Sequence, residues 1–315
     1  EFRRVLFRSA FTSLSPKIIL RLFQYRPKLI FTNSFGFWTI LALLFKYIGR
    51  WQVVIAYEGS APGVDFRTSP LRLWIRKMMV KIADACITNS NEGKNYLTDI
   101  LEAEPKKVFA QPYEIPAAAS LLDKEKIREL PSISDQQPVF LFVGRIIPRK
   151  GLHFLLEACR NLKKLGYQNY TLLIVGEGQQ RPELEAFCKK HNLEDCVKWI
   201  GKVNYQDISR YFQAADVFIL PTLEDTWVVV ILEAMLFGKP ILCSRGAGSS
   251  ELINNGENGY IFDPKEPKEL AQFMAKFIEN PKLFKVMGLK SQEIIAPHTP
   301  EKASQFLAQV VYFLS

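Results

Sequence analysis

Short apolar runs alternate with longer amphipathic stretches along the first third of the chain. Four of the runs are apolar and bounded by polar residues, as buried strands are: residues 28–32, 52–57, 85–88 and 108–110. The spacing of apolar positions between them predicts helices at about residues 36–47, 69–83 and 90–101. Strands that alternate with helices indicate a parallel sheet. We therefore expect residues 10–116 to form one α/β domain.

A second alternating series follows a polar, proline-containing segment at residues 117–137, which we interpret as a linker. Its expected strands are residues 139–143, 171–175, 197–200, 217–220, 240–243 and 260–262. Its expected helices lie near residues 152–165, 180–190, 205–213, 228–237, 249–254, 266–278 and 281–295. These residues, 138–296, predict a second α/β domain. An amphipathic helix in residues 297–315 is expected to pack back on the first domain.

One stretch, residues 216–238, combines a buried strand, an acidic turn and an apolar helix. The strand ends at Pro221, and Glu224 and Asp225 begin the turn. Open α/β sheets bind ligands at the carboxyl ends of their strands, and a helix N-terminus there favours phosphate. Glu233 interrupts the apolar helix, and a buried carboxylate requires a partner. The stretch therefore predicts a ligand site.

A basic loop follows the strand at residues 139–143. Gly144 permits a tight turn, and Arg145, Arg149 and Lys150 come next, before a helix that starts after Gly151. Arginine can grip a diphosphate as a fork and lysine as a mobile point charge. A solvated basic loop is the alternative interpretation.

Two further glycine-containing turns follow predicted strands. Val175-Gly-Glu-Gly178 is a weak signal, because a tight strand-to-helix turn is the favoured explanation. The segment from Ser244 to Glu251 contains glycines that permit close approach of the backbone to a ligand. Within it, Ser249 is a candidate cap for the next helix.

Composition excludes several classes of protein. No apolar run reaches the roughly 20 residues that a membrane-spanning helix needs. The five cysteines lack metal-binding spacing and are odd in number, which indicates a reducing compartment, and the three histidines are scattered. The net charge is +9, yet no nucleic-acid recognition motif accompanies it. We therefore expect no disulfide framework, no metal site and no nucleic-acid partner.

The first nine residues, EFRRVLFRS, resemble a sequencing adapter translated in frame. We therefore treat residues 1–9 as a non-native segment that takes no part in the fold. We also expect the natural N-terminus to be missing, which would leave the first domain incomplete.

Taken together, the motifs resemble a known family. GRIIPRKG, VGEG, IGKVNYQDI, an acid followed eight residues later by Glu233, GAGSSELI and NGENGYIFDP occur in the order and spacing of the C-terminal domain of glycosyltransferase family 4. The resemblance covers residues 138–295 strongly and 25–115 weakly. It implies a GT-B fold, with two Rossmann-like parallel-sheet domains, and sugar transfer from a nucleotide donor with retention of configuration.

The resemblance also implies roles for individual residues. Arg145 and Lys150 would hold the donor diphosphate and stabilise its leaving charge. Glu233 would bind the ribose, and Asp225 occupies the place of the acid that contacts the transferred sugar, a task that the adjacent Glu224 could share. Val228 stands where the family often has glycine. The remaining expected substrate contacts are Gly144, Gly201, Lys202, Thr226, Trp227 and Val228.

The expected partners follow from the same resemblance. The nucleotide sugar is a co-substrate, no cofactor is expected, and the lack of an Asp-x-Asp motif indicates metal-independent transfer. The acceptor would be a glycan or lipid-linked, and turns at Glu58-Gly59 and Asn89-Ser90 could line the cleft. We expect a cytoplasmic location, with peripheral membrane contact as an option. One helix carries Arg72, Arg76, Lys77 and Lys81, which suits an anionic lipid surface or simply a solvated face.

Two alternatives remain open at this stage. The chain could have another GT-B activity, such as a phosphorylase or a sugar-nucleotide epimerase. It could also be a binding module with a degenerate site, or a truncated and inactive fragment, because half of the cleft would be missing.

Overall fold

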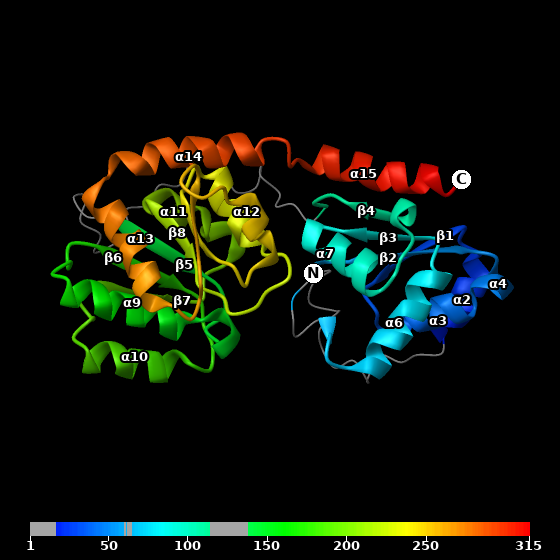
Figure 1. Cartoon of the computed structure of the whole chain (residues 1–315), viewed down its shortest axis with the longest axis horizontal. Coiled ribbons are helices and arrows are strands. Elements are labelled where there is room, and N and C mark those ends of the chain that lie inside the picture. The colour runs from blue at the N-terminus through cyan, green and yellow to red at the C-terminus, as the bar shows by residue number, and fades with distance from the viewer. Residues whose placement is uncertain (1–16, 60, 62–64, 114–137) are drawn as a thin grey trace.

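The structure, a computed structural model, describes residues 17–59, 61, 65–113 and 138–315. Two parallel sheets lie side by side, each with helices packed against it (Figure 1). We call the part around the first sheet the N lobe and the part around the second sheet the C lobe. The expected adapter-like segment 1–9 and the expected linker 117–137 lie outside the described residues.

The N-lobe sheet has the order β1-β2-β3-β4, and all of its described pairings are parallel. Its strands are β1 (Leu29–Asn33), β2 (Gln52–Tyr57), β3 (Ala85–Thr88) and β4 (Val108–Ala110). Its helices are α2 (Lys17–Tyr25), α3 (Phe37–Leu44), α4 (Lys46–Gly49), α6 (Pro70–Ile82) and α7 (Asn91–Asn95). Helix α7 continues as a π-helix (Tyr96–Ile100), and a 3-10 turn (Pro105–Lys107) precedes β4.

The C-lobe sheet has the order β10-β9-β8-β5-β6-β7, again with parallel pairings. Its strands are β5 (Val139–Val143), β6 (Thr171–Val175), β7 (Val197–Gly201), β8 (Val217–Leu220), β9 (Ile241–Ser244) and β10 (Gly259–Phe262). Its α-helices are α9 (Leu152–Lys164), α10 (Arg181–Lys190), α11 (Ser209–Ala214), α12 (Val229–Leu236), α13 (Pro267–Glu279) and α14 (Lys282–Ile295). Three 3-10 turns complete it: Pro148–Lys150, Tyr205–Asp207 and Gly248–Leu252.

The predicted parallel α/β fold is confirmed, and the described strands start and end within a residue or so of their expected positions. Helix α2 was not predicted. The helix expected at residues 36–47 is divided at Phe45 into α3 and α4, and the one expected at residues 249–254 is a 3-10 turn. Short helical segments carry too few periodic positions to separate these helix types from sequence.

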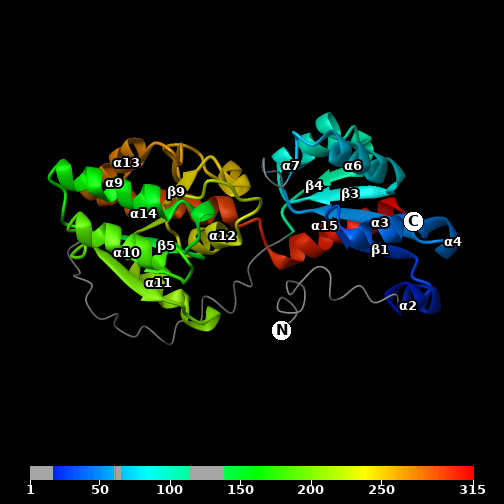
Figure 2. The same ribbon diagram turned by 90° about the horizontal axis from the view of Figure 1, so that it is seen from below.

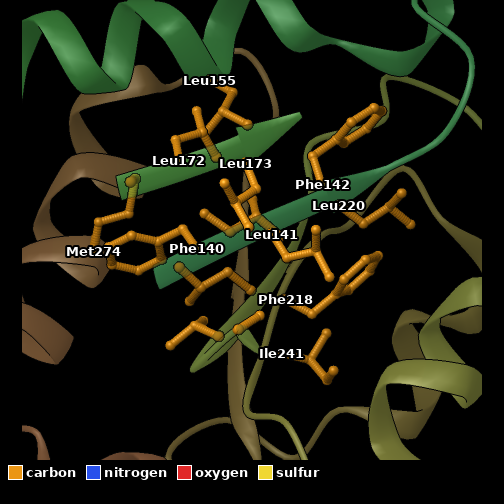
Figure 3. Close-up of a cluster of buried hydrophobic side chains, with 14 of the residues drawn as sticks. Phe140, Leu141, Phe142, Leu155, Leu172, Leu173, Phe218, Leu220, Ile241 and Met274 are labelled. Carbon is orange, nitrogen blue, oxygen red and sulfur yellow. The ribbon is translucent and has the colours of Figure 1, made fainter. Parts of the chain in front are cut away.

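The C-lobe core explains why its strands were easy to recognise. Strands β5, β6, β8 and β9 are buried along nearly their whole length, and their side chains meet helices from both faces of the sheet. Figure 3 shows Phe140, Leu172 and Phe218 among these side chains, with Leu155 of α9 and Met274 of α13 beside them. A sheet covered on both faces requires continuous apolar strands rather than alternating ones.

The last helix, α15 (Pro300–Phe313), leaves the C lobe and packs against the N-lobe sheet (Figure 1, red). Phe306 and Val310 are buried against β2 and β3, and the Phe306 ring stacks on Tyr113 at a centroid distance of 6.4 Å. The Gln52 side-chain amide donates a 2.6 Å hydrogen bond to the Leu314 carbonyl. The C-terminal segment therefore contributes to the N-lobe core.

One expectation about α6 is wrong. Arg76 does not belong to an exposed basic face, because it is buried and its guanidinium donates to the Asp65 carbonyl at 2.9 Å and the Tyr96 hydroxyl at 2.8 Å. Arg76 therefore lies on the inner face of α6, whereas the opposite face of this helix is exposed. Within the described ranges, no helix combines the length and apolar character needed to cross a bilayer.

The α15 contact can be tested through Phe306. Phe306→Ala should lower the free energy of unfolding of the N lobe by about 3 kcal/mol, because it removes a buried aromatic ring. Hydrogen exchange read by mass spectrometry should show faster exchange in β2 and β3, with β5 and β6 unchanged. Tyr312→Ala, at a position 87% exposed on the same helix, is the matched control. Unchanged exchange in β2 and β3 would show that α15 does not support the N lobe.

Candidate functional site

The C-lobe strand order has its switch point between β5 and β8, where a ligand crevice is expected. The chain moves outward from β5 to β6 and β7, and then returns to the other side of β5 to form β8. At such a switch point the loops after the two central strands diverge, which leaves room for a ligand. The loops here are residues 144–151 and 221–228, the two that carry most of the predicted site residues.

These two loops are tied together by their backbones. The Leu223 amide donates to the Arg149 carbonyl at 2.8 Å, and the Thr222 hydroxyl donates to the same carbonyl at 3.0 Å. Gly151 has φ +67°, and a Cβ there would lie 2.0 Å from the Pro221 carbonyl oxygen. A glycine is therefore needed both for the backbone conformation and for the close approach.

A third loop, residues 244–251, fixes the position of Asp225. The Asp225 amide donates to the Gly246 carbonyl at 2.8 Å, and the Gly248 amide donates to the Asp225 carbonyl at 3.0 Å. A Cβ on Gly248 would lie 1.9 Å from the Thr226 carbonyl oxygen, so this contact also requires glycine. The acidic turn is thus held from both sides by main-chain bonds.

The charged centre of the crevice is an acid between two cations. Asp225 pairs with Lys150 through one carboxylate oxygen and with Arg149 through the other, at 2.8 Å for Arg149. The side chains of Lys150 and Asp225 are each only 13% exposed, and the Arg149 guanidinium also donates to the Glu224 carbonyl at 2.7 Å. Lys150 and Asp225, predicted separately, are therefore direct partners. Arg149, which the basic loop pattern included but the family resemblance gave no role, is the third member.

Arg145 lies in the same loop but has a different environment. Its side chain is exposed, and within the described ranges its guanidinium forms no ion pair or hydrogen bond. The neighbouring Gly144 amide donates to the Val175 carbonyl at 3.0 Å, which ties this turn to the loop after β6. Arg145 is therefore a cation available to a ligand at the mouth of the crevice.

Glu233 lies beneath the crevice on α12 and is buried. The Tyr205 hydroxyl donates to its carboxylate at 2.9 Å. Tyr205 begins a 3-10 turn just after Gly201 and Lys202, so it joins the loop after β7 to the acid on α12. Gly201 has φ +84° and is buried, whereas the Lys202 side chain is exposed. The sequence predicted that Glu233 needs a partner but did not identify Tyr205.

The remaining predicted residues differ in exposure. Thr226 is half-buried at the turn, whereas the side chains of Trp227 and Val228 belong to the C-lobe core. A ligand could meet Trp227 and Val228 only through their backbones. Val228 precedes α12 in an extended conformation.

The predicted capping role of Ser249 is wrong. The 3-10 turn begins at Gly248, so Ser249 lies inside it, and the residue before the turn is Ala247. The Ser249 hydroxyl is buried and has no hydrogen-bond partner among the described residues.

The N lobe meets this site through the ends of β2 and β3. The carboxylate of Glu251, at the end of the third loop, accepts hydrogen bonds from the Asn91 amide at 3.0 and 3.3 Å. Desolvation at this contact raises the pKa of Glu251 above its ordinary value, while the Asn91 amide and the neighbouring donors oppose the shift. Gly59 is buried beside Thr226, with its ideal Cβ position 3.5 Å from the Thr226 carbonyl carbon. The expected cleft turns, Glu58-Gly59 and Asn89-Ser90, therefore do lie beside the C lobe.

The described side chains do not form a cluster of three or more His, Cys, Asp or Glu residues able to hold a metal ion. The five cysteines are buried free thiols. Among the described residues, the site offers an exposed arginine that forms no ion pair, two cations that share one acid, and a buried acid, a set suited to a polyanion attached to a polar ligand.

Comparisons with known proteins identify the family of the chain. The model of the family "Glycosyl transferases group 1" matches residues 123–293, more than half of the chain. The chain belongs to this family.

Similar curated proteins include an uncharacterized glycosyltransferase of Haemophilus influenzae, 31% identical over 58% of this chain and 50% of its own length. The alpha-D-kanosaminyltransferase of Streptomyces kanamyceticus is 24% identical over 69% of this chain and 56% of its own length. The chain thus spans about half the length of the curated relatives it matches.

Solved structures show the same fold. A glycosyltransferase from Rickettsia africae superposes with a TM-score of 0.79 at 17% identity, covering 98% of this chain and 84% of its own. The HepE protein of Anabaena, in complex with UDP, has a TM-score of 0.73 at 20% identity and covers 95% of this chain and 80% of its own. The architecture of this chain is therefore the GT-B fold.

The contact between the lobes can be tested at Glu251. Glu251→Ala removes the acceptor for the Asn91 amide and should shift the balance between closed and open lobes about ten-fold toward open forms, the size expected for a charge-assisted hydrogen bond. Glu251→Gln, which retains a carbonyl acceptor, should show a smaller shift. Distance distributions between spin labels placed on α6 and α10 would report it. Glu194→Ala removes an exposed acid near β7 and serves as the control. Identical distributions for all variants would show that this contact does not hold the lobes together.

Proposed function

We propose that this glycosyltransferase belongs to family 4 and transfers a hexose from a nucleotide-sugar donor to a glycan or lipid-linked acceptor with retention of anomeric configuration. The observation that carries the proposal is the cation cluster at the β5–β8 switch point, where Lys150 and Arg149 share Asp225 and Arg145 is exposed beside them.

The leaving group of such a reaction is a nucleoside diphosphate, whose negative charge grows as the glycosidic bond breaks. Arg145 and Lys150 would stabilise that charge, the arginine by paired N–H donors and the lysine as a point charge. These fixed cations would supply the positive charge that a divalent ion supplies in other transferases, so we propose metal-independent transfer without a cofactor. The sequence supports this through its lack of an Asp-x-Asp motif.

Asp225 would act at two stages. Before the donor binds, its carboxylate neutralises Lys150 and Arg149 and holds both at the crevice. When the diphosphate arrives, it competes for these cations, and the carboxylate of Asp225 can turn to a sugar hydroxyl. Glu224 precedes it in the same turn and would share the sugar contact.

The nucleoside end of the donor would lie toward β7. Glu233 would bind the ribose, and the loop of Gly201 and Lys202 would lie beside the base. The Tyr205–Glu233 hydrogen bond supports this arrangement, because it joins the two segments that would hold neighbouring parts of one ligand. Backbone groups at Gly144 and from Thr226 to Val228 would complete the contacts.

Names of similar proteins support the donor and acceptor classes. The HepE protein of Anabaena was solved with UDP and glucose, and one relative is an amylovoran biosynthesis glycosyltransferase of Erwinia amylovora, 33% identical over 44% of this chain and 36% of its own length. Uridine diphosphate is therefore the first ligand to test.

The adapter origin of residues 1–9 and the expected truncation stay predictions that sequencing upstream of this coding region would test.

Arg145 provides the sharpest test. Arg145→Ala should weaken binding of UDP by about ten-fold or more, because a charge-assisted hydrogen bond is worth roughly 1.5–3 kcal/mol. Isothermal titration calorimetry on the whole chain would measure it, and Lys189→Ala, which removes an exposed charge on α10, is the control. NMR of any glycoside product would give its anomeric configuration. Equal UDP affinity in the wild type and Arg145→Ala would place the diphosphate elsewhere, and an inverted product would overturn the retaining mechanism.

A further inference from the structure

Asp65 is fully buried in the N lobe, although its side chain is an acid. One of its carboxylate oxygens accepts hydrogen bonds from the Tyr57 hydroxyl and, at 3.4 Å, from the Ala61 amide. The Arg67 guanidinium pairs with the other oxygen at 2.9 Å. Both oxygens are therefore engaged, and the acid joins the last residue of β2 to a segment further along the chain.

The backbone of Asp65 is held as firmly as its side chain. Its carbonyl accepts from the Arg76 guanidinium at 2.9 Å and the Tyr96 hydroxyl at 2.7 Å, and its amide donates to the Ala61 carbonyl at 2.8 Å. Phe66, the next residue, has a φ of 52°, which is rare for an aromatic residue, and Tyr96 begins the π-helix. Irregular backbone of both kinds is frequent at functional sites. An apolar cluster of the same size could stabilise the lobe equally well, so what the polar groups add is a fixed geometry.

The Tyr57 hydroxyl links this polar cluster to the end of β2. Burial, followed by the hydrogen bond to Asp65, raises the pKa of Tyr57 far above its ordinary value, so the hydroxyl stays protonated and donates. Tyr57 is the last residue of β2, and the turn of Glu58 and Gly59 follows directly. The position of Asp65 therefore sets the direction in which the chain leaves the sheet.

That turn lies between the two lobes. Gly59 is buried, and its ideal Cβ position is 3.3 Å from the Ser90 Oγ and 3.6 Å from the Thr226 carbonyl oxygen. The Asn89 side-chain amide donates to the Glu58 carbonyl at 3.1 Å. Figures 1 and 2 both show α7, which begins just after Ser90, on the side of the N lobe that faces the C lobe. The cluster is thus connected, through one short turn, to the acidic turn of the candidate site.

We propose that Asp65 is a positioning residue for the N-lobe side of the candidate site, and that it acts through the Tyr57 hydroxyl. With this hydrogen bond in place, the turn of Glu58 and Gly59 stays against the acidic turn and keeps the two lobes at one spacing. Without it, the turn loses its orientation, whereas the cations of the C lobe stay where they are. The effect on catalysis rests on the proposed sugar transfer, but the effect on lobe spacing does not.

The first test measures lobe spacing in variants of the whole chain. Tyr57→Phe keeps the ring and removes the donor, and Tyr170→Phe, 1% exposed in the C-lobe core, is the matched control for loss of a buried hydroxyl. Spin labels on Leu44→Cys of α3 and Lys189→Cys of α10 would report the distance, since the native cysteines are buried. Tyr57→Phe should raise the population of wider spacings about ten-fold, the size expected for one hydrogen bond to a charged acceptor. Tyr170→Phe should leave the distribution unchanged.

A kinetic measurement separates positioning from binding. With UDP-glucose as donor and water as acceptor, the products are UDP and glucose. Tyr57→Phe should lower kcat for this reaction by about ten-fold and leave KM and the Kd of UDP unchanged. Adding Tyr57→Phe to Asp65→Ala should cause no further change in lobe spacing, because the hydroxyl has then already lost its acceptor. Thermal unfolding would verify that every variant is folded.

The two measurements fail in different ways. Equal distance distributions for the wild type and Tyr57→Phe would overturn the proposal, and so would an equal change in Tyr170→Phe, which would reduce the effect to a general loss of stability. A further change in the double variant would show that Tyr57 acts through another contact than Asp65. A wild type that neither binds UDP nor releases glucose would count against the proposed function, and the distances would still decide the role of Asp65.

Discussion

The carboxylate of Asp225, held between Lys150 and Arg149, is the interaction on which the candidate site depends. An acid and a lysine with side chains each 13% exposed could not remain charged there alone, since burying an unpaired charge is costly. The pair is possible only because three loops bring residues 149–150 and 225 together and fix them with main-chain bonds. Sheet topology therefore determines the charge arrangement, and the charge arrangement determines which ligands the crevice can accept.

The rigid and the adjustable parts of the molecule differ in their chemistry. Within the C lobe, backbone-to-backbone contacts at Gly151 and Gly248 leave no space even for a Cβ, so these loops have little freedom. Between the lobes, the contact through Glu251 and Asn91 is made by a side chain rather than by close backbone packing, so it can rearrange more easily. Helix α15 keeps the lobes joined throughout, because its apolar residues are part of the N-lobe core. A rigid candidate site beside a less tightly held N lobe is the expected result.

The sequence predicted the strands and the loops of the site, because a parallel sheet covered on both faces requires continuous apolar strands and places ligands at their carboxyl ends. It did not predict the partners. Arg149 and Asp225 are far apart in sequence, as are Tyr205 and Glu233, and their pairing depends on strand order, which no local pattern contains. The burial of Arg76 was not predicted either, because it too depends on partners that the fold brings together. A cation in an amphipathic helix is normally solvated, and only the fold supplies the Asp65 carbonyl and Tyr96 hydroxyl that allow its burial.

The inner face of α6 is joined to the part of the N lobe that meets the candidate site. On the inner face, Arg76 holds the Asp65 carbonyl, and the fully buried Asp65 carboxylate accepts from the Tyr57 hydroxyl at the end of β2. This network fixes the end of the segment that begins after β2, and the start of that segment contains Gly59, which lies against Thr226 of the C lobe. The buried contacts of Arg76 and Asp65 therefore help to hold the end of β2, from which the backbone continues to Gly59, beside the acidic turn.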